Sequence, residues 1–319
     1  MNLEEDANNN ILPIINNNDT ENESHNFYIS SRGFMKICDY YSSTPISGVK
    51  QVIDYPTISS LSKPVLYICS SAIPHFIKNM LKKIDFQFIL VSGDCNNTCP
   101  MNVFSTRYQY IQFMEDPRII HWFVQNFTET HEKITNIPIG LDYHTMKIDT
   151  KMGDITSCYD QENILNQIIS IAKPFHERIQ KCYGNFQFAM NTRFAYDRYD
   201  ARFNIDNKLV FYEPCQISRI ETWKKQTEYS FVISPHGEGY DCHRTWEALI
   251  LGCIPIVKQS KIDMLYENLP VLIVERWSDV TDELLKVTIT QFQQKTFQYQ
   301  KLSLEYWKQK IYSFKKNEK

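Results

Sequence analysis

Short apolar runs alternate with amphipathic stretches along the first half of the chain. Such runs, when Pro, Gly or Asp bounds them, are typical of buried strands, and apolar positions three to four residues apart are typical of helices. The pattern predicts helices at 74–83 and 108–114 and strands at 65–69, 86–91, 119–124 and 134–141. Strands that alternate with helices form βαβ units around a parallel sheet.

The same alternation resumes after a predicted helix at 160–180, which Pro174 kinks or restarts. Gly252 follows the helix predicted at 243–251 and is a good C-terminal stop. The second half predicts helices at 217–226, 243–251 and 279–316 and strands at 186–190, 229–234, 254–257 and 271–274. Two successive α/β units indicate two Rossmann-like domains with a cleft between them.

Composition sets limits on the protein class. The 319 residues are 43% hydrophobic and carry a formal net charge of -3, so the bulk of the chain should fold. A near-neutral chain has no general attraction to nucleic acid or to an anionic membrane. No signal peptide and no apolar run long enough for a membrane span is evident, so we expect a soluble protein in the cytoplasm, of the host if the source is viral.

Nine cysteines, an odd number without a repeating spacing, indicate reduced thiols. Cys95 and Cys99 are spaced like a metal or redox pair. A structural zinc site needs four ligands, and neither a second pair nor a nearby His completes the set, so we expect no metal here.

The N-terminal residues are rich in Asn, Asp and Glu and poor in apolar residues, which predicts disorder because such a segment buries too little surface to offset its ordering entropy. The predicted organisation has five parts: a disordered tail (1–26), a first Rossmann-like domain (27–160), a connecting helix (161–180), a second Rossmann-like domain (181–285) and a C-terminal helix (286–319).

The segment Ser234 to Leu249 carries the clearest chemistry. A buried strand ends at Ser234, a loop with Gly237 and Gly239 follows, and a helix begins near Asp241. Ligands of open α/β sheets bind beyond the carboxyl ends of strands, and a helix N-terminus presents free N–H groups that suit phosphate. Glycines let the backbone approach a ligand closely. The segment therefore predicts an anion site.

Arg244 and Glu247 are three residues apart, so they lie on one face of this helix. Arg244 in the first turn can meet a diphosphate, and Glu247 can accept hydrogen bonds from a ribose diol. The alternative is an ordinary surface ion pair, which the flanking glycine loop and apolar strand make less favoured. Asp241 is either a ligand contact or a helix cap, and Glu238 is a possible contact with the sugar.

The motif from Ser234 to Leu249, followed by Gly252-Cys-Ile-Pro-Ile-Val257, resembles the C-terminal signature of the exostosin-like glycosyltransferases (glycosyltransferase family 47 and its relatives). The form with Asp-Cys-His-Arg and Trp-Glu is similar to a subgroup seen in viruses, algae and other microbes. Pro138 to Asp142 and Asn185-Phe186 add to the resemblance, which covers roughly residues 180 to 280.

This resemblance implies an α/β protein of GT-B architecture. Two Rossmann-like domains with parallel sheets would face a cleft, the second would hold the donor, and the C-terminal helix would pack back on the first. It also implies metal-independent transfer with inversion from a nucleoside diphosphate sugar, with UDP favoured, to a hydroxyl of a glycan, glycoprotein or glycolipid. No cofactor is expected beyond the donor. Unlike animal exostosins, this sequence lacks an anchor, a stem and a second catalytic domain.

A transfer of this kind needs a cation for the leaving diphosphate and a general base near the acceptor hydroxyl. We expect Arg193, after the strand predicted at 186–190, to join the donor site, whereas Arg198 and Arg202 are equally well explained as a solvated basic loop. Asp142 and His144 are the favoured bases, ahead of Asp94, although each is also explained as a turn residue. The donor-binding residues predicted are Arg193, Ser234, Gly237, Glu238, Gly239, Asp241, Arg244 and Glu247.

Two other functions remain open at this stage. A domain of the same fold could hold a nucleotide or a glycan without turnover. A nucleotide-sugar-modifying enzyme, such as an epimerase of similar topology, would need no separate acceptor. Retention of Arg193, Arg244 and Glu247 favours the transferase.

Overall fold

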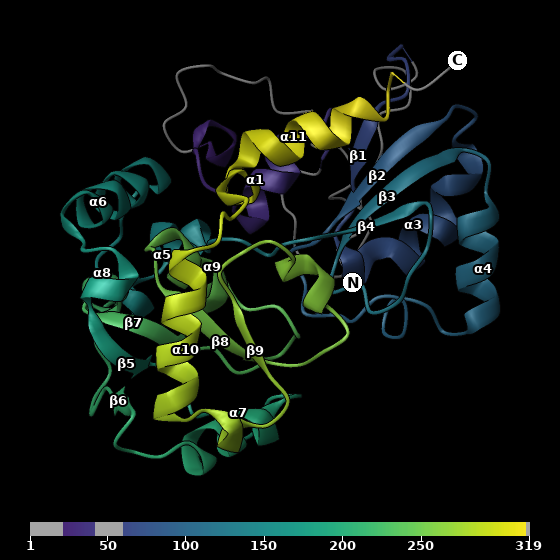
Figure 1. Cartoon of the computed structure of the whole chain (residues 1–319). Coiled ribbons are helices and arrows are strands. Elements are labelled where there is room, and N and C mark those ends of the chain that lie inside the picture. The colour runs from purple at the N-terminus through teal and green to yellow at the C-terminus, as the bar shows by residue number, and fades with distance from the viewer. Residues whose placement is uncertain (1–21, 42–59, 317–319) are drawn as a thin grey trace, which may run out of the picture. The chain divides into compact units, whose positions relative to one another are not determined.

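The computed structural model describes residues 22–41 and 60–316 (Figure 1). They form two compact units. Unit 1 lies within Arg32–Ile137 and Trp307–Lys319, and unit 2 lies within Thr20–Ser31 and Pro138–Tyr306. Residues 138–160, predicted to belong to the first domain, therefore lie in unit 2.

Unit 1 is built on a four-stranded parallel sheet with the strand order β1-β2-β3-β4. Its first three strands are buried almost throughout, which explains why they appear as continuous apolar runs in the sequence. The four predicted strands are confirmed as β1 (Val65–Tyr67), β2 (Phe88–Ser92), β3 (Ile119–Gln125) and β4 (Ile134–Ile137). The helices predicted between them are α3 (Ile73–Asn79) and α4 (Arg107–Glu115), and α1 (Ser31–Lys36) precedes the sheet.

Unit 2 contains a five-stranded parallel sheet with the order β6-β5-β7-β8-β9. The two parallel sheets confirm the predicted α/β class. The strands are β5 (Ile179–Gly184), β6 (Val210–Tyr212), β7 (Tyr229–Ile233), β8 (Ile254–Lys258) and β9 (Leu272–Val274). The helices before the C-terminal segment are α5 (Tyr143–Ile148), α6 (Cys158–Ile171), α7 (Ala195–Asn204), α8 (Arg219–Gln226) and α9 (His243–Ile250).

The strand predicted at 186–190 is wrong. Residues 185–189 form a loop, and the strand at this place in the sheet is β5. The first three residues of β5 are exposed, whereas Cys182 and Tyr183 are buried. Because only the second half of β5 is buried, the strand does not appear as an apolar run in the sequence.

The single helix predicted at 279–316 is also wrong. The structure has α10 (Asp282–Gln293) in unit 2 and α11 (Leu304–Ser313), most of which lies in unit 1. Leu285 and Ile289 of α10 join the core of the second sheet, so its apolar face is used within unit 2. Between the two helices the buried Phe297 packs against Phe292, with ring centroids 5.1 Å apart.

The C-terminal helix packs on unit 1, as predicted. Trp307 of α11 makes an edge contact with Phe34 of α1, with ring centroids 5.9 Å apart. The Tyr312 hydroxyl donates a hydrogen bond of 2.9 Å to the carbonyl of Ile37, and Phe314 stacks on His121 of β3 at 4.0 Å.

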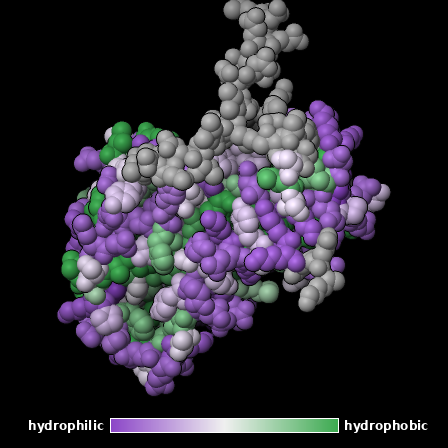
Figure 2. Space-filling model, turned by 90° about the horizontal axis from the view of Figure 1, so that it is seen from above, coloured by the Kyte–Doolittle hydropathy of each residue, from purple (hydrophilic) through white to green (hydrophobic). Residues whose placement is uncertain are grey.

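The core of unit 2 lies between the second sheet and α10. It joins Phe231, Ile233, Ile254 and Ile256 of the sheet with Trp277, whose indole N–H donates a hydrogen bond of 2.8 Å to the buried Asp197. The surface seen in Figure 2 is mostly hydrophilic, with separate hydrophobic patches.

The predicted N-terminal tail is only partly testable, because residues 1–21 lie outside the described residues. Residues 22–26, assigned to the same tail, are ordered. Glu23–His25 form a turn of 3-10 helix in which Glu23 is buried and accepts a hydrogen bond of 2.6 Å from Ser30. Asn26 donates to the carbonyl of Cys158 at the start of α6, so the segment predicted as a connecting helix lies within unit 2.

Two glycines with positive φ allow a test of the close contact between the backbone of Gly140 and that of Ile29. Gly140 has φ 65, and a Cβ there would lie 2.5 Å from the carbonyl oxygen of Ile29. Gly252 has φ 71, but a Cβ there would meet only the Arg178 side chain at 3.2 Å. We expect Gly252→Ala to lower the free energy of unfolding by about 1 kcal/mol, the cost of a left-handed residue with a side chain. Gly140→Ala should cost clearly more, because backbone must also move.

Urea unfolding of both variants measures this difference. Equal losses would show that the contact between residues 29 and 140 is not as close as the structure has it.

Candidate functional site

The candidate site lies in unit 2, where β7 ends and α9 begins. Ser234 directly follows β7, is buried, and shares a hydrogen bond of 2.8 Å with the hydroxyl of Thr245 on α9. Its backbone N–H donates to Ile256 of the neighbouring strand at 2.9 Å. The strand end and the first turn of the helix are therefore fixed to each other, at the edge where parallel sheets usually bind ligands.

The loop between them turns tightly around Gly237. Its N–H donates to the carbonyl of Gly239 at 3.0 Å, and its own carbonyl accepts a hydrogen bond of 3.2 Å from Phe194. A Cβ at Gly237 would lie 2.9 Å from a guanidinium nitrogen of Arg198 and 3.3 Å from the Cys242 sulfur. The missing side chain thus leaves room for an arginine to reach the loop backbone.

Two arginines meet at this loop, and we call them the arginine pair. Arg198 of α7 is only 8% exposed and donates hydrogen bonds to the carbonyls of Gln187 at 2.9 Å and His236 at 3.3 Å. Arg244 of α9 donates to the carbonyl of Pro235 at 3.3 Å. Within the part of the chain that the structure describes, neither guanidinium has an ion pair with a carboxylate.

The charge of Arg198 is felt at Arg244. Burial lowers the pKa of Arg244, Cys242 and Glu247 raise it, and the positive charge of Arg198 lowers it. Arginine nevertheless stays protonated at neutral pH. Two neighbouring positive charges that bond mainly to carbonyl groups can attract an anion.

A second group of side chains, the Asp142 cluster, includes Glu247 of α9. Asp142 caps α5 by accepting a hydrogen bond of 3.0 Å from the N–H of Thr145. Arg219, the first residue of α8, lies 3.3 Å from the Asp142 carboxylate and 3.5 Å from the Glu247 carboxylate. His144 Nδ1 lies 3.1 Å from the other Asp142 oxygen. Arg219 therefore bridges two buried acids.

The Asp142 carboxyl is held in its charged form. Burial raises its pKa, but this is outweighed by His243, His144 and Arg219 and by the hydrogen bond from Thr145, so the pKa lies well below its usual range. A carboxylate this acidic is a poor proton acceptor at neutral pH. The position of Asp142 suits it better for holding His144, whose Nδ1 lies 3.1 Å from the carboxylate.

His243 and Asp241 join the loop 138–142 to α9. His243 Nδ1 lies 2.7 Å from the Gly140 carbonyl, which requires the proton on Nδ1. Asp241 accepts a hydrogen bond of 2.7 Å from the N–H of Ile139 and bonds of 2.8 and 3.0 Å from the indole of Trp246. Burial raises the pKa of Asp241 to about 6, although these donors lower it. The carboxylate oxygens of Asp241 therefore hold the loop 138–142 and α9 together.

The predicted residues separate into distinct places. Ser234, Gly237, Gly239, Arg244 and Glu247 gather at the start of α9, and Asp142 and His144 join them within unit 2. This moves the two favoured bases from the predicted acceptor domain into the predicted donor domain, because Ile139, Gly140 and Asp142 bond to Asp241, His243 and Arg219.

The other candidates lie elsewhere. Asp94 is in unit 1, 3.8 Å from Arg32. Arg193 does not follow a strand: it is exposed on the loop before α7, where its N–H bonds the exposed Glu238 at 3.4 Å.

Two arginines of this region have a weak signal in the sequence. Arg198 is equally well explained there as a ligand contact or as part of a solvated basic loop, whereas the structure begins α7 at Ala195 and buries the side chain. Arg219 is not singled out by the sequence, because a basic residue at the start of an amphipathic helix has no special signal.

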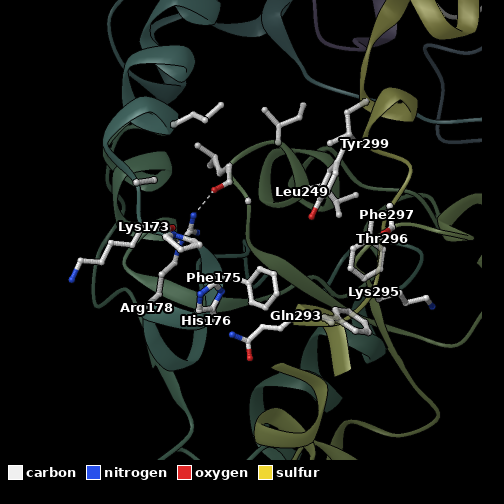
Figure 3. Close-up of a pocket in the computed structure, with 18 of the residues that line it drawn as sticks. Lys173, Phe175, His176, Arg178, Leu249, Gln293, Lys295, Thr296, Phe297 and Tyr299 are labelled. Atoms are coloured by element: carbon white, nitrogen blue, oxygen red, sulfur yellow. Dashed lines mark hydrogen bonds between the residues drawn. The ribbon is translucent and has the colours of Figure 1, made fainter. Parts of the chain in front are cut away.

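A cavity of about 970 Å³ lies away from these side chains. It is lined by residues 172–176 and Arg178 before β5, by Leu251 and Gly252 before β8, and by the end of α10. Figure 3 shows Phe175 and His176 at its centre, with Lys173 and Lys295 extending outward at opposite ends. Because the strands are parallel, this is the amino edge of the second sheet, opposite to the edge that carries the arginine pair.

Residues 22–41 and 60–316 offer no group of three His, Cys, Asp or Glu side chains that could hold a metal ion. None of their helices is long and apolar enough to cross a membrane.

Comparisons with known proteins give distant structural likenesses. No protein-family model matches the chain, and no curated protein matches it. Among solved structures it is similar to an alpha1,3-fucosyltransferase with GDP-fucose, with 12% identity and a TM-score of 0.40 over 85% of this chain and 93% of that one. It is also similar to TarM, with 12% identity and a TM-score of 0.37 over 77% of this chain and 51% of that one.

Because Arg219 contacts the charged Asp142, the substitution Asp142→Asn should lower the free energy of unfolding by an amount that depends on pH. Asparagine is chosen because its side chain can still cap α5. At pH 7 the variant should be less stable by about 3 kcal/mol, since it leaves a buried arginine with one partner fewer. The folded pKa of Asp142 is depressed, so its contribution is complete above the unfolded value of about 3.9 and is lost as pH falls further.

Urea unfolding at pH 7, 5, 4 and 3 measures the difference between the two proteins. The difference in the free energy of unfolding should stay constant down to about pH 4 and become smaller at lower pH. Asp282→Asn, which removes an exposed pair with Lys286, is the control and should change little at any pH. A pH-independent difference would contradict the role of the charge.

Proposed function

We propose that this protein is a glycosyltransferase that uses a nucleoside diphosphate sugar as donor. The observation that carries the proposal is the arginine pair: Arg198 and Arg244 meet at the Gly237 loop, beyond the end of β7, without a carboxylate partner among the described residues. Two guanidinium groups beside glycine backbone offer two positive charges to the two phosphates of a diphosphate.

The Asp142 cluster supports a polar ligand next to the diphosphate. Glu247 lies one turn along α9 from Arg244, and Arg219 holds its carboxylate from 3.5 Å. A carboxylate fixed in this way can accept two hydrogen bonds from a ribose diol. We assign Glu247 to the ribose, with Arg219 as the residue that positions it, and we expect UDP as the nucleotide.

The reaction proposed is transfer with inversion to a hydroxyl of a glycan, glycoprotein or glycolipid. The acceptor oxygen bonds to the anomeric carbon, the bond from that carbon to the diphosphate oxygen breaks, and the hydroxyl proton passes to a base. His144 is our choice of base, with Asp142 orienting it, because the low pKa of Asp142 makes that carboxylate a weak proton acceptor. Asp94 in unit 1 remains the second candidate.

The leaving nucleoside diphosphate takes up negative charge as the bond breaks. Fixed cations can stabilise this charge without a metal ion, and the arginine pair supplies two of them. We therefore propose a metal-independent transfer with no cofactor besides the donor. We assign the exposed Arg193, whose N–H bonds Glu238 at 3.4 Å, to the sugar end of the donor.

The competing function is a domain that binds a nucleotide or glycan without turnover. The arginine pair is equally suited to that function. The Asp142 and His144 contact favours an enzyme, because a binding domain needs no oriented imidazole. Activity measurements on His144 variants separate the two.

The arginine pair predicts which ligands the protein binds. In a thermal-shift panel, nucleoside diphosphates and their sugars should stabilise the protein, by about 2.7 kcal/mol at 100 times the dissociation constant. Arg244→Gln should weaken nucleoside diphosphate binding about 10- to 100-fold, the loss of a charge-assisted contact. Arg202→Gln, on the same helix as Arg198 but bonded to Asn207, should bind normally.

If none of these nucleotides raises the melting temperature of the protein, the result would count against a nucleotide-sugar donor. Equal weakening by Arg202→Gln would mean that general positive charge, and not the arginine pair, attracts the ligand.

His144→Gln should lower kcat by about 10²- to 10⁴-fold while KM for the donor changes little, because a general base acts on the chemical step. Transfer is measured with the best donor of the panel in the presence of a chelator. His176→Gln, at the other edge of the sheet, is the control and should retain full activity. Full activity of His144→Gln would move the base to another residue, and Asp94→Asn is then the variant to test.

A further inference from the structure

Two cysteines come together at the carboxyl edge of the first sheet. The parallel pairing of β1 and β2 continues beyond the strands, with Ile68 N–H donating to Val91 at 3.0 Å and Ser70 N–H to Gly93 at 3.1 Å. This places Cys69 beside the loop that follows β2. Its sulfur lies 3.6 Å from the carbonyl oxygen of Asp94, the residue directly before Cys95, and the electrostatics of each thiol include the other.

The two thiols have different surroundings. Cys69 is completely buried, whereas Cys95 is partly exposed. The hydrogen bond from Cys69 lowers the pKa of Cys95 against the opposing effect of burial, and the backbone N–H of Asn97 lowers it further. The same hydrogen bond, together with burial, raises the pKa of Cys69. An accessible thiolate thus lies against a protected thiol.

We propose that Cys69 and Cys95 form a site of reversible oxidation, which a peroxide converts to a disulfide. The Cys95 thiolate attacks one peroxide oxygen and becomes a sulfenic acid, releasing hydroxide that takes up a proton as water. The Cys69 sulfur then attacks the sulfenic sulfur, the S–O bond breaks, and a second water leaves with the Cys69 proton. Two thiols are oxidised, one peroxide is reduced, and a thiol reductant reverses the change.

The other cysteines explain why this pair is selected. Cys99, which the sequence spacing pairs with Cys95, is completely buried, and burial raises its pKa. Cys38 and Cys158 are also buried. Cys215 is exposed and Cys242 is partly exposed, but burial raises the pKa of Cys242. Among the cysteines that the structure describes, Cys95 combines access, a lowered pKa and a neighbouring thiol.

The disulfide would join the end of β1 to the loop that carries Asp94. That loop is already constrained, because Asp94 has φ 50 and its carboxylate lies 3.8 Å from Arg32. Hydrogen-bonded thiols must approach further to reach the bond length of about 2.05 Å, and the loop residue Cys95 is the one free to move toward a buried partner. This inference does not depend on glycosyl transfer.

The test uses the full-length reduced protein treated with hydrogen peroxide and digested for mass spectrometry under non-reducing conditions. The expected product is a peptide pair linked through Cys69 and Cys95, which disappears after dithiothreitol. In the reduced protein, iodoacetamide should label Cys95 at a lower pH than Cys215, by at least one unit, because the thiolate is the reactive form.

Two substitutions at Cys69 separate its roles. Cys69→Ser keeps a hydroxyl donor, so Cys95 should still react at low pH but stop at the sulfenic or sulfinic acid. Cys69→Ala removes the donor and should shift the labelling of Cys95 toward that of Cys215. Cys215→Ser is the matched control and should form the disulfide normally.

Three results would overturn the proposal: a peroxide-treated wild type without the Cys69–Cys95 link, a link between Cys95 and a different cysteine, or labelling of Cys95 that follows the pH dependence of Cys215. Because Cys95→Ser alters an accessible side chain, it checks the assignment independently of folding. It should abolish the linked peptides and leave the thermal transition unchanged.

Discussion

The contact of Arg219 with two buried acids is the constraint on which the candidate site depends. Its guanidinium lies between the carboxylates of Asp142 and Glu247, and all three side chains are less than a tenth exposed. Burying one acid alone would cost several kcal/mol, and burying two side by side would cost more. The arginine offsets this cost by its contact with both carboxylates. It also joins α8, the loop before α5 and the middle of α9 at one point.

The same loop is tied to α9 by uncharged contacts. Gly140 can approach because it lacks a side chain and adopts φ 65, and its carbonyl then meets His243. The N–H of Ile139 meets Asp241. The chain between β4 and α5 thus becomes part of unit 2. Residues distant in sequence share a single polar environment at the carboxyl edge of the second sheet.

The positive charge of the candidate site is a local feature of a chain with a small negative net charge. The chain as a whole has a formal charge of -3, yet Arg198 and Arg244 lie together without acidic partners among the described residues. Most other buried charges are compensated: Asp197, for instance, accepts from the N–H of His236 and from Trp277. Two neighbouring cations without an ion pair among the described residues are a feature expected of a site for an anion.

The sequence by itself determined most of the strands, the α/β class and the start of α9. These depend on local apolar runs and on glycine, which act over a few residues. It failed for β5, whose exposed first half lacks an apolar run, and for the C-terminal helices, whose continuous amphipathic pattern does not record that α10 and α11 bury their faces in different units. For the candidate site, Arg244 and Glu247 could be predicted from the sequence because they adjoin a glycine loop. Arg198, Arg219 and Cys69 were decided by tertiary structure alone, because each gains its role from a partner between 26 and 77 residues away, a proximity that only the packed sheets create.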